Sequence, residues 1–489
     1  MAVQIGAQPR VAIIGSGFSG LAAAIELRRQ GIEDFVIFEK APGMGGTWFY
    51  NRYPGAEVDL ESHIYSFSFE RYDWSRTHAH WDELLGYLEH VARKWNLTDR
   101  IRLNEKVEEV RWSDEDRTWT LTTSSGADHG AFTAVISAVG FLNIPLIPPF
   151  AREEHDFEGA ICHTSSWIEG LDMTGKKVGV VGTGSSAVQI VTEAERVAAE
   201  VKIFQIEPNW ILPKNSRAFS PWERRLNRLA PVYLYRRYKL YLGYDLRQLG
   251  AGHARADGRA NQRRRRAAEA FLRQELGSRP DLLELATPKF PFEGRRTVIS
   301  DTYYAALRNP KVTLVPHAVK GLTRTGAVDA NGDEHELDII VLATGFDAAN
   351  YLGNYRVYGR NGVEIHDEWA GEPQALLGMM VPNFPNFFIM YGPNTNSVPL
   401  VTFYEAQAAF AAGLIKKAAR TGRRLIEVRR SAFLLYNEWI QDTLANTVWA
   451  KVDSYFHAGS GRIVSQWPFN ATTYLAAVKL ARRFGVRLS

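Results

Sequence analysis

The stretch VAIIGSGFSGLAAAIELRRQGIEDFVIFE, residues 11–39, decides the fold. Its first four residues form an unbroken apolar run that ends at a glycine, which is typical of a buried parallel strand. A segment rich in helix formers follows the glycine-rich turn, and a second apolar run at 35–38 comes next. A strand, a turn, a helix and a strand within about 30 residues predict a βαβ unit.

The turn in this unit has the glycine spacing of a dinucleotide-binding site. Gly15 permits the tight turn, Gly17 lets the backbone approach a pyrophosphate, and Gly20 lets the helix pack on the strand. The helix N-terminus supplies unpaired N–H groups and a positive dipole end. Glu39 lies about 20 residues beyond Gly20, where an acid accepts the ribose hydroxyls. The predicted contacts are Gly15, Gly17, Phe18, Ser19, Gly20 and Glu39.

A second unit repeats the pattern near the middle of the chain. We expect a strand at 177–181, a turn at 182–187, a helix at 188–198 and a strand at 201–204. Ala187 takes the place of the third glycine, which this fingerprint tolerates. Two such units predict one site for a flavin and one for a nicotinamide, with hydride passing between them.

Length and composition limit the class of protein. A chain of 489 residues is long enough for two or three domains, and 45% hydrophobic with 23% charged residues is ordinary for a globular protein. The net charge of +4 is too slight over this length to indicate a nucleic-acid or membrane field. The single cysteine, Cys162, excludes an internal disulfide and a two-thiol redox centre. With no signal peptide at the start and no apolar run of membrane-spanning length, we expect a soluble cytoplasmic protein.

The segments outside the two units predict further elements. Four apolar residues at helical spacing predict an amphipathic helix: Leu84, Tyr87, Leu88 and Val91. Strands are expected at 119–123 and 135–140, and the Arg- and Leu-rich stretch 221–285 is expected to be helical. The arginine run at 263–266 has a nucleic-acid reading, but nearby glutamates and the near-neutral total favour a solvated helix face.

Four longer segments resemble those of the Baeyer–Villiger monooxygenases. Residues 45–62 read GGTWFYNRYPGAEVDLES and resemble the family's flavin-clamping segment. Residues 157–167 read FEGAICHTSSW and fit the fingerprint Phe-x-Gly-x-x-x-His-x-x-x-Trp, whose last residue N- and S-oxygenating relatives usually lack. DIIVLATGF at 338–346 is similar to the linker between lobes, and FPNFFIMYGPNTN at 384–396 to the returning flavin segment.

This resemblance implies an α/β fold with two Rossmann-like dinucleotide-binding domains and a helical insert. The implied FAD-binding domain comprises 1–148 and 350–489. The implied NAD(P)-binding domain comprises 149–216 and 290–349, with the insert at 217–289.

The resemblance also implies the reaction. Electrons from NAD(P)H reach FAD, O2 adds at the flavin C4a position, and the resulting peroxide attacks a ketone to give an ester or lactone. A developing anion in a dry pocket needs a fixed positive charge, which a guanidinium supplies. In PFEGRRTVISDTYY at 291–304, Arg296 matches the family's catalytic arginine, and Asp59 matches the carboxylate that orients it. The alternative for this pair is a routine ion pair.

Further site residues follow from the same resemblance. The implied flavin contacts are Gly46, Thr47, Trp48, Asp59, Tyr65, Val107 and Leu400. The implied nicotinamide pyrophosphate loop contains Gly182, Thr183, Gly184, Ser185, Ser186 and Gln189, and Arg295 matches the residue at the adenosine 2′-phosphate. No metal site is expected, and the expected partners are O2 and a ketone or thioether, with no nucleic acid.

One departure from the family concerns the coenzyme. After the second unit's outer strand the family usually has Gln-Arg-Thr, but this chain has Ile206 and Glu207 after its glutamine. A carboxylate repels a phosphate dianion and accepts hydrogen bonds from a free 2′-hydroxyl. NADP(H) is therefore the family expectation and NAD(H) an open alternative, with Arg295, Lys214 or Arg217 as compensating cations.

Two other readings of the function remain open. The same scaffold could oxygenate amines or sulfides through the hydroperoxyflavin, or it could be a turnover-deficient redox sensor. His163 and Trp167 of the fingerprint are interpreted as structural or conformational residues, and Ile168 replaces the family's Pro or Asp. Loops near Leu400 and residues 454–467 are expected to line the substrate pocket.

Overall fold

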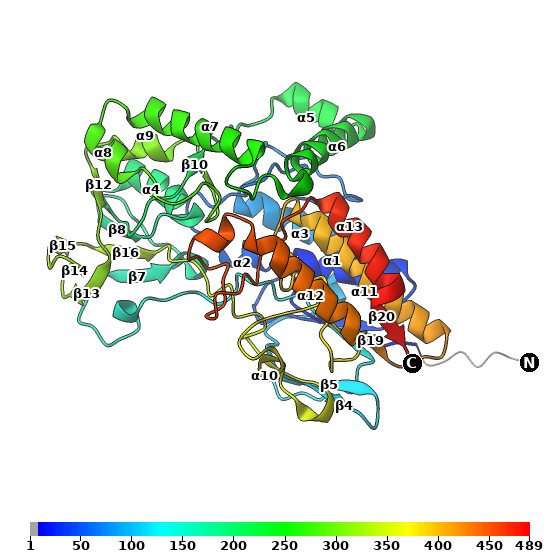
Figure 1. Ribbon diagram of the computed structural model, residues 1–489. Helices are drawn as coiled ribbons and strands as arrows, with labels where there is room; N and C mark the ends of the chain where they lie inside the picture. The colour runs from blue at the N-terminus through cyan, green and yellow to red at the C-terminus, as the bar shows by residue number, and fades with distance from the viewer. Residues whose placement is uncertain (1–7) are drawn as a thin grey trace, which may run out of the picture.

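The computed structural model describes residues 8–489, so the predicted lack of a signal peptide concerns residues outside the described part. Its first sheet is built around the βαβ unit predicted from residues 11–39, and all its strands are parallel (Figure 1). The strand order is β18 (Phe387–Ile389), β6 (Ala134–Ser137), β1 (Val11–Ile14), β2 (Phe35–Phe38) and β3 (Ile101–Arg102). Every residue of β1 is buried, as expected of a central parallel strand.

Helices cover this sheet and bury their apolar faces. Helix α1 (Phe18–Arg29) packs beside α11 (Leu400–Arg420), and both lie near α13 (Ala471–Leu480). It begins within the glycine turn itself, earlier than expected, because Gly20 has no side chain to keep the helix away from Gly15. Helix α3 (Trp81–Lys94) confirms the predicted stripe, since all four of its named apolar residues are buried.

The second sheet repeats the arrangement of the first and is again parallel. Its strand order is β12 (Val312–Val315), β9 (Glu200–Phe204), β8 (Lys177–Val181), β16 (Ile339–Leu342) and β7 (Ala160–His163). Helix α4 (Ser185–Val197) follows the turn after β8 and packs against α9 (Tyr303–Leu307).

Smaller sheets and helices complete two lobes. The first lobe is built on the first sheet and the second lobe on the second sheet. One antiparallel hairpin with an added parallel strand contains β4 (Val107–Ser113), β5 (Thr118–Thr123) and β17 (Arg356–Tyr358). A meander contains β13 (Val319–Thr323), β14 (Gly326–Asp329) and β15 (Glu334–Glu336). The remaining pairs and helices are β10 (Ile211–Leu212) with β11 (Val298–Ile299), β19 (Ile426–Val428) with β20 (Val486–Leu488), α2 (Thr47–Tyr50), α10 (Ile365–Trp369) and α12 (Arg430–Ala445).

The stretch predicted as helical divides between the two lobes. Helices α5 (Pro221–Asn227) and α6 (Ala230–Arg247) lie at the outer edge of the molecule, and Tyr233 of α6 joins the core of the first lobe. Helices α7 (Arg259–Leu276) and α8 (Pro280–Leu285) contribute to the core of the second. The boundaries assigned to the three domains stay a prediction.

The arginine run on α7 is only partly a solvated face. Arg265 pairs with Glu269 one turn along the helix, as an exposed i,i+4 pair does. Arg264 instead pairs with Glu293 and lies at a cavity wall, where burial lowers the pKa of its guanidinium to about 10. Across residues 8–489, no helix combines the length and apolar character that a membrane crossing requires.

Candidate active site between two glycine turns

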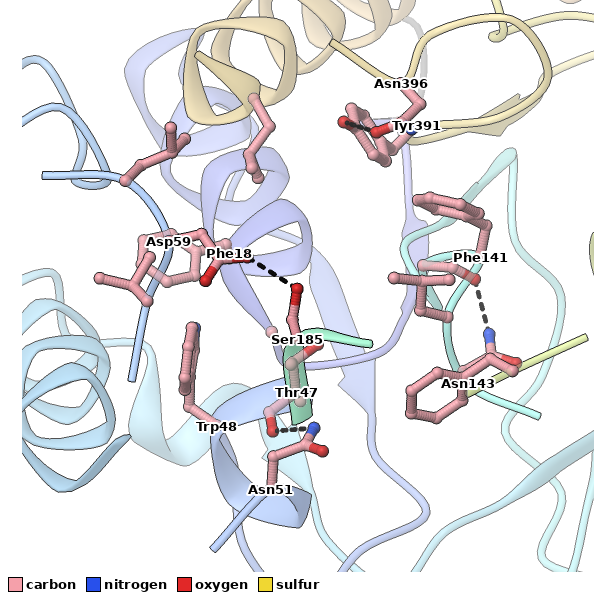
Figure 2. Close-up of a pocket in the computed structure, with 18 of the residues that line it drawn as sticks. Phe18, Thr47, Trp48, Asn51, Asp59, Phe141, Asn143, Ser185, Tyr391 and Asn396 are labelled. Atoms are coloured by element: carbon pink, nitrogen blue, oxygen red, sulfur yellow. Dashed lines mark hydrogen bonds between the residues drawn. The ribbon is translucent and has the colours of Figure 1, made fainter. Parts of the chain in front are cut away.

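A cavity of about 990 Å³ extends from the first glycine turn to the start of α4, just after the second glycine turn. Of the residues predicted from the sequence, it is lined by Gly15, Gly17, Phe18, Ser19, Glu39, Gly46, Thr47, Trp48, Asp59, Tyr65, Val107, Ser185, Ser186, Gln189, Arg295, Arg296 and Leu400. Gly20, Gly182, Thr183, Gly184 and Glu207 are not among the lining residues. Figure 2 shows part of this cavity, with Phe18, Trp48 and Asp59 on one side and Phe141 and Tyr391 on the other.

The backbone of the first turn can be built only from glycine at key positions. Gly15 has φ +102°, and a Cβ there would lie 2.6 Å from the carbonyl oxygen of Ala138. A Cβ on Gly20 would lie 1.9 Å from the Gly15 carbonyl oxygen. Gly17 and Gly46 approach so closely that a Cβ on Gly46 would lie 3.0 Å from the Gly17 Cα. The turn therefore presents bare backbone to the cavity.

The first turn also offers a positive helix end and a buried carboxylate. Helix α1 has no side-chain cap and no acidic residue in its first turn, so its N–H groups remain available to an anion. Glu39 is buried and accepts hydrogen bonds from the Ser16 backbone N–H at 2.9 Å and hydroxyl at 2.7 Å. Its other oxygen accepts from the Ala41 N–H. This arrangement suits the phosphates and ribose of a dinucleotide.

The second turn repeats the geometry of the first. Gly182 has φ +113°, and a Cβ there would lie 2.6 Å from the carbonyl oxygen of Ala343. No atom lies within 4 Å of the Cβ position at Gly184, so this backbone is open to a ligand. Ala187 is fully buried, as the third glycine position requires, and α4 has neither a side-chain cap nor an acidic first turn.

Asp59 brings together residues from distant parts of the chain. Its Oδ2 accepts from Arg296 Nη2 at 2.6 Å and from Ser185 Oγ at 3.2 Å, the second of which Figure 2 marks. Lys214 Nζ lies 4.0 Å from Asp59 Oδ1 and 2.8 Å from Glu57 Oε1. The carboxylate therefore joins the first lobe, the start of α4 and the loop after α8.

The Arg296 guanidinium is a permanent positive charge at the cavity wall. Burial lowers its pKa, but the Asp59 carboxylate together with Tyr455 and Tyr391 outweighs that effect, and the pKa is raised. Three tyrosines near it, Tyr65, Tyr391 and Tyr455, have raised pKa values because they are buried, with that of Tyr65 at about 12. Next to Asp59, the cavity wall thus holds a fixed cation, Arg296, near hydroxyls that stay protonated at neutral pH.

Aromatic residues form the wall on the side of the first lobe. Trp48 Nε1 donates to the Tyr65 hydroxyl at 3.2 Å, and their rings meet edge to face. From the segments expected to surround the substrate, Leu400, Tyr455 and Trp467 also line the cavity. These rings give the cavity near Arg296 an aromatic and apolar wall.

Arg295 and Glu207 form an ion pair at the second lobe. Arg295 Nη1 lies 2.5 Å from Glu207 Oε2. The Glu207 backbone carbonyl accepts from Thr183 Oγ1 at 2.9 Å, so this residue is adjacent to the second turn. Of the other two cations considered in the sequence, Lys214 pairs with Glu57 and Arg217 with Glu223.

The position after the second strand holds an acid, Glu39, in the first lobe but an amide, Gln205, in the second. Phe204 ends β9 opposite Val181, as Phe38 ends β2 opposite Ile14, so Gln205 corresponds to Glu39. Gln205 is buried and donates to the Leu285 carbonyl at 2.8 Å. The carboxylate near the second turn is therefore Glu207, two residues later.

The fingerprint residues His163 and Trp167 lie within the second lobe and are not among the residues that line the cavity. His163 Nδ1 accepts from the Ser165 N–H, which leaves Nε2 to donate to the Gly345 carbonyl at 3.1 Å. Burial lowers the His163 pKa, so the ring is neutral. Trp167 packs against the core of the second sheet. His163 thus connects β7 to the segment after β16.

Sequence reasoning missed several residues of the cavity wall, among them Tyr53 and Glu57. The Tyr53 hydroxyl donates to Gln189 Oε1 at 2.6 Å and lies 3.2 Å from Ser186 Oγ. Glu57 pairs with Lys214. Both residues lie in the segment 45–62 already singled out for its family resemblance, which was the available signal.

The residues present fit a flavin and a nicotinamide dinucleotide. Two uncapped helix N-termini and two glycine turns with bare backbone suit two pyrophosphates. Glu39 suits a ribose, and the volume between the turns suits large cofactor rings. Among the described residues, no cluster of His, Cys, Asp or Glu could hold a metal ion.

Comparisons with known proteins agree with this geometry. Residues 12–290 match the family described as pyridine nucleotide-disulphide oxidoreductase. A Baeyer–Villiger monooxygenase of Pseudomonas aeruginosa is 37% identical, over 94% of this chain and 87% of that protein. The FAD-binding monooxygenase ktnD of Aspergillus niger is 35% identical, over 96% of this chain and 80% of that protein. An oxidized steroid monooxygenase bound to NADP has a TM-score of 0.88 at 28% identity, with 98% of this chain and 99% of that one covered. The fold is α/β with two dinucleotide-binding domains, and the chain belongs to the Baeyer–Villiger monooxygenase family.

Proposed function

We propose that this monooxygenase inserts one oxygen atom of O2 next to the carbonyl of a ketone, and that Arg296 and Asp59 are its catalytic residues. The observation that supports this most strongly is the 2.6 Å pair between Arg296 and Asp59 at the wall of the cavity between the two glycine turns. The flavin, when bound, supplies hydride acceptance and oxygen activation.

The chain's own residues would bind and orient the reactants. Arg296 would place a guanidinium next to developing negative charge on oxygen, and Asp59 would hold that guanidinium in one orientation. The raised pKa of Arg296 supports this role because the group cannot lose its proton. Trp48 and Tyr65 would limit water at the reacting atoms.

The cofactor positions follow the two turns. FAD would bind the first lobe through the turn at 15–20, Glu39 and the segment 46–48, and NADP(H) would bind the second through residues 182–189. The proposed FAD-binding domain is 1–148 with 350–489, the NAD(P)-binding domain is 149–216 with 290–349, and the insert is 217–289. A cytoplasmic location is proposed from the single cysteine.

Replacement of Arg296 tests the catalytic proposal. The Arg296→Ala variant should keep FAD and still oxidise NADPH, but lactone formation from a cyclic ketone should fall by about a hundredfold or more. Arg296→Lys should recover only part of the activity because it lacks the planar fork. Unchanged lactone formation in Arg296→Ala, or sulfoxide from a thioether with no lactone in the parent protein, would contradict the proposal.

A further inference from the structure

The outward face of α5 and α6 exposes large apolar side chains in a continuous row. Trp222 is 62% exposed, Tyr235 66% and Leu246 65%. The row comprises Trp222, Leu226, Leu229, Leu234, Tyr235, Tyr238, Leu242, Leu246 and Leu249. Within α5 and α6 most successive members are three or four residues apart and so share one side of the helix, while Leu229 and Leu249 flank the two ends of α6. We call this set the outer row.

The outer row is accompanied by positive charge and not by negative charge. The two acidic residues of 221–250, Glu223 and Asp245, are both buried. Glu223 pairs with Arg217, and Asp245 accepts from Asn470 and Thr472. In the described part of the chain, no acidic partner lies within ion-pairing distance of the exposed cations Arg225 and Lys239.

The opposite side of α6 accounts for its attachment to the protein. Arg237 donates to the His63 carbonyl at 2.6 Å and to Ser66, and the Tyr244 hydroxyl donates to Glu61 at 2.7 Å. Tyr233 is buried against His63. The outer row is therefore not needed to anchor the helix, although leaving it in water has an energetic cost.

We propose that the outer row docks on the surface of an anionic lipid bilayer. Helix α6 has 18 residues, about 27 Å at 1.5 Å per residue, and it lies at the edge of the molecule with α5 (Figure 1). Leucine, tyrosine and tryptophan with interspersed cations are the composition of helices that lie in the membrane interface. The overall net charge of +4 conceals this local excess of basic residues.

A second copy of the chain is a poorer partner for this face. The common symmetric dimer brings the same patch of both copies together. Here it would bring Arg225 and Lys239 of both copies into one interface, with the two acids of the segment already buried. Charge complementarity therefore favours anionic lipid headgroups.

The position of α6 also suggests how substrate arrives, a step that rests on the proposed function. Tyr244 and Arg247 in its last turn, and Gln248 just beyond it, line the active-site cavity. The docked face and the cavity wall thus belong to one helix. The substrate class consistent with this placement is a lipophilic ketone dissolved in the bilayer.

Flotation of the holoprotein with lipid vesicles tests the docking. It should bind vesicles of phosphatidylcholine with phosphatidylglycerol, and bind at least tenfold less to phosphatidylcholine alone or at raised salt. The variant Tyr235→Ser/Tyr238→Ser/Leu246→Ser should lose this binding by a similar factor while keeping FAD. The matched control Leu434→Ser/Leu435→Ser changes exposed leucines on α12 and should bind like the parent.

The remaining outcomes decide whether the docking proposal, the proposed function or both must be abandoned. No vesicle binding, or equal binding by the parent and the outer-row variant, overturns the docking proposal. A dimer in solution that only the outer-row variant dissociates overturns it in favour of a second copy. Oxygenation of a bilayer-dissolved ketone should fall in the variant while that of a water-soluble ketone is unchanged. Intact vesicle binding without oxygenation of any ketone would refute the proposed function and leave the docking standing.

Discussion

At the scale of single residues, Asp59 determines where the Arg296 guanidinium lies. One carboxylate oxygen accepts from both Arg296 and Ser185, and Lys214 approaches the other. These partners come from the start of α4 and from two loops of the second lobe. A change at Asp59 therefore acts on the orientation of Arg296 and on the contact between the lobes.

The Asp59→Asn variant tests whether the negative charge of Asp59, rather than the size of its side chain, is needed for activity. The amide keeps the size of the side chain but loses the ion pair, so kcat for ketone oxygenation should fall by about a hundredfold while FAD remains bound. Steady-state kinetics and the flavin absorbance measure the two properties. Asp73→Asn, which breaks a surface pair with Arg224 and Arg228, is the matched control and should leave kcat unchanged. An equal loss in both variants would contradict a specific role for Asp59.

Glu207 should reduce the preference for NADPH through its pair with Arg295. This pair is partly exposed, so its worth is about 1 kcal/mol or less. In Glu207→Gln the guanidinium becomes available to a 2′-phosphate and a repulsive charge is lost. KM for NADPH should fall about threefold to fivefold and KM for NADH should not. Anaerobic flavin reduction with each coenzyme measures this. Arg295→Gln should show the opposite change for NADPH, and an NADH preference gained by Glu207→Gln would refute the assignment.

At the scale of elements, Gly20 of the first turn and Gly184 of the second stand at different positions of the glycine pattern and serve different purposes. A Cβ on Gly20 would meet the Gly15 carbonyl at 1.9 Å, whereas a Cβ on Gly184 would meet nothing within 4 Å. Gly20 is required for packing of α1 on β1. Gly184 leaves space for a ligand next to the start of α4.

Alanine at Gly20 should therefore lower stability, whereas alanine at Gly184 should weaken coenzyme binding. Gly20→Ala should lower the melting temperature and the FAD content together, because α1 must move. Gly184→Ala should melt as the parent does but raise KM for NADPH by about tenfold, because the methyl group occupies ligand space. Thermal unfolding and coenzyme kinetics distinguish them. A destabilised Gly184→Ala with an unchanged KM would show that this glycine serves packing instead.

Elements were predictable from the sequence where their determinants are local. The strands at 11–14, 35–38 and 177–181 are confirmed, and each is a short, largely apolar run. The stripe of α3 is likewise contained in one helix. Arg264 differs from the expected solvated face because its partner, Glu293, lies beyond the next helix and its pairing depends on tertiary packing.

In the site, too, residues within one motif were predictable, whereas contacts between distant segments were not. The glycine turns and the family motifs identified most of the cavity wall, since a motif keeps its residues close together. The Tyr53 contact with Gln189 and the pair between Glu207 and Arg295 join segments far apart in the chain. The spacing of residues within a motif does not predict such contacts, because they depend on tertiary packing.

At the scale of the whole molecule, α6 connects the helical stretch to the first lobe through a buried histidine. The His63 ring lies between Phe219 and Tyr233, 4.7 Å from the latter, and is 3% exposed. Burial, with Arg236 and Arg237 nearby, lowers its pKa to about 4. His253, beyond α6, also has a pKa lowered by burial to about 4. Both rings are therefore neutral in the folded protein at neutral pH.

These two histidines should make the fold sensitive to acid. Between pH 6.5 and 4 the unfolded chain binds protons at both rings and the folded chain does not, so stability falls as pH falls. Each contributes up to about 1.4 kcal/mol per pH unit. In His63→Phe, which suits its aromatic neighbours, the slope of unfolding free energy against pH should decrease by about half of the histidine contribution. Urea unfolding across this range measures the slope, and the exposed His155→Gln serves as the control. An unchanged slope in His63→Phe would mean that His63 takes up its proton without leaving the contact between α6 and the first lobe.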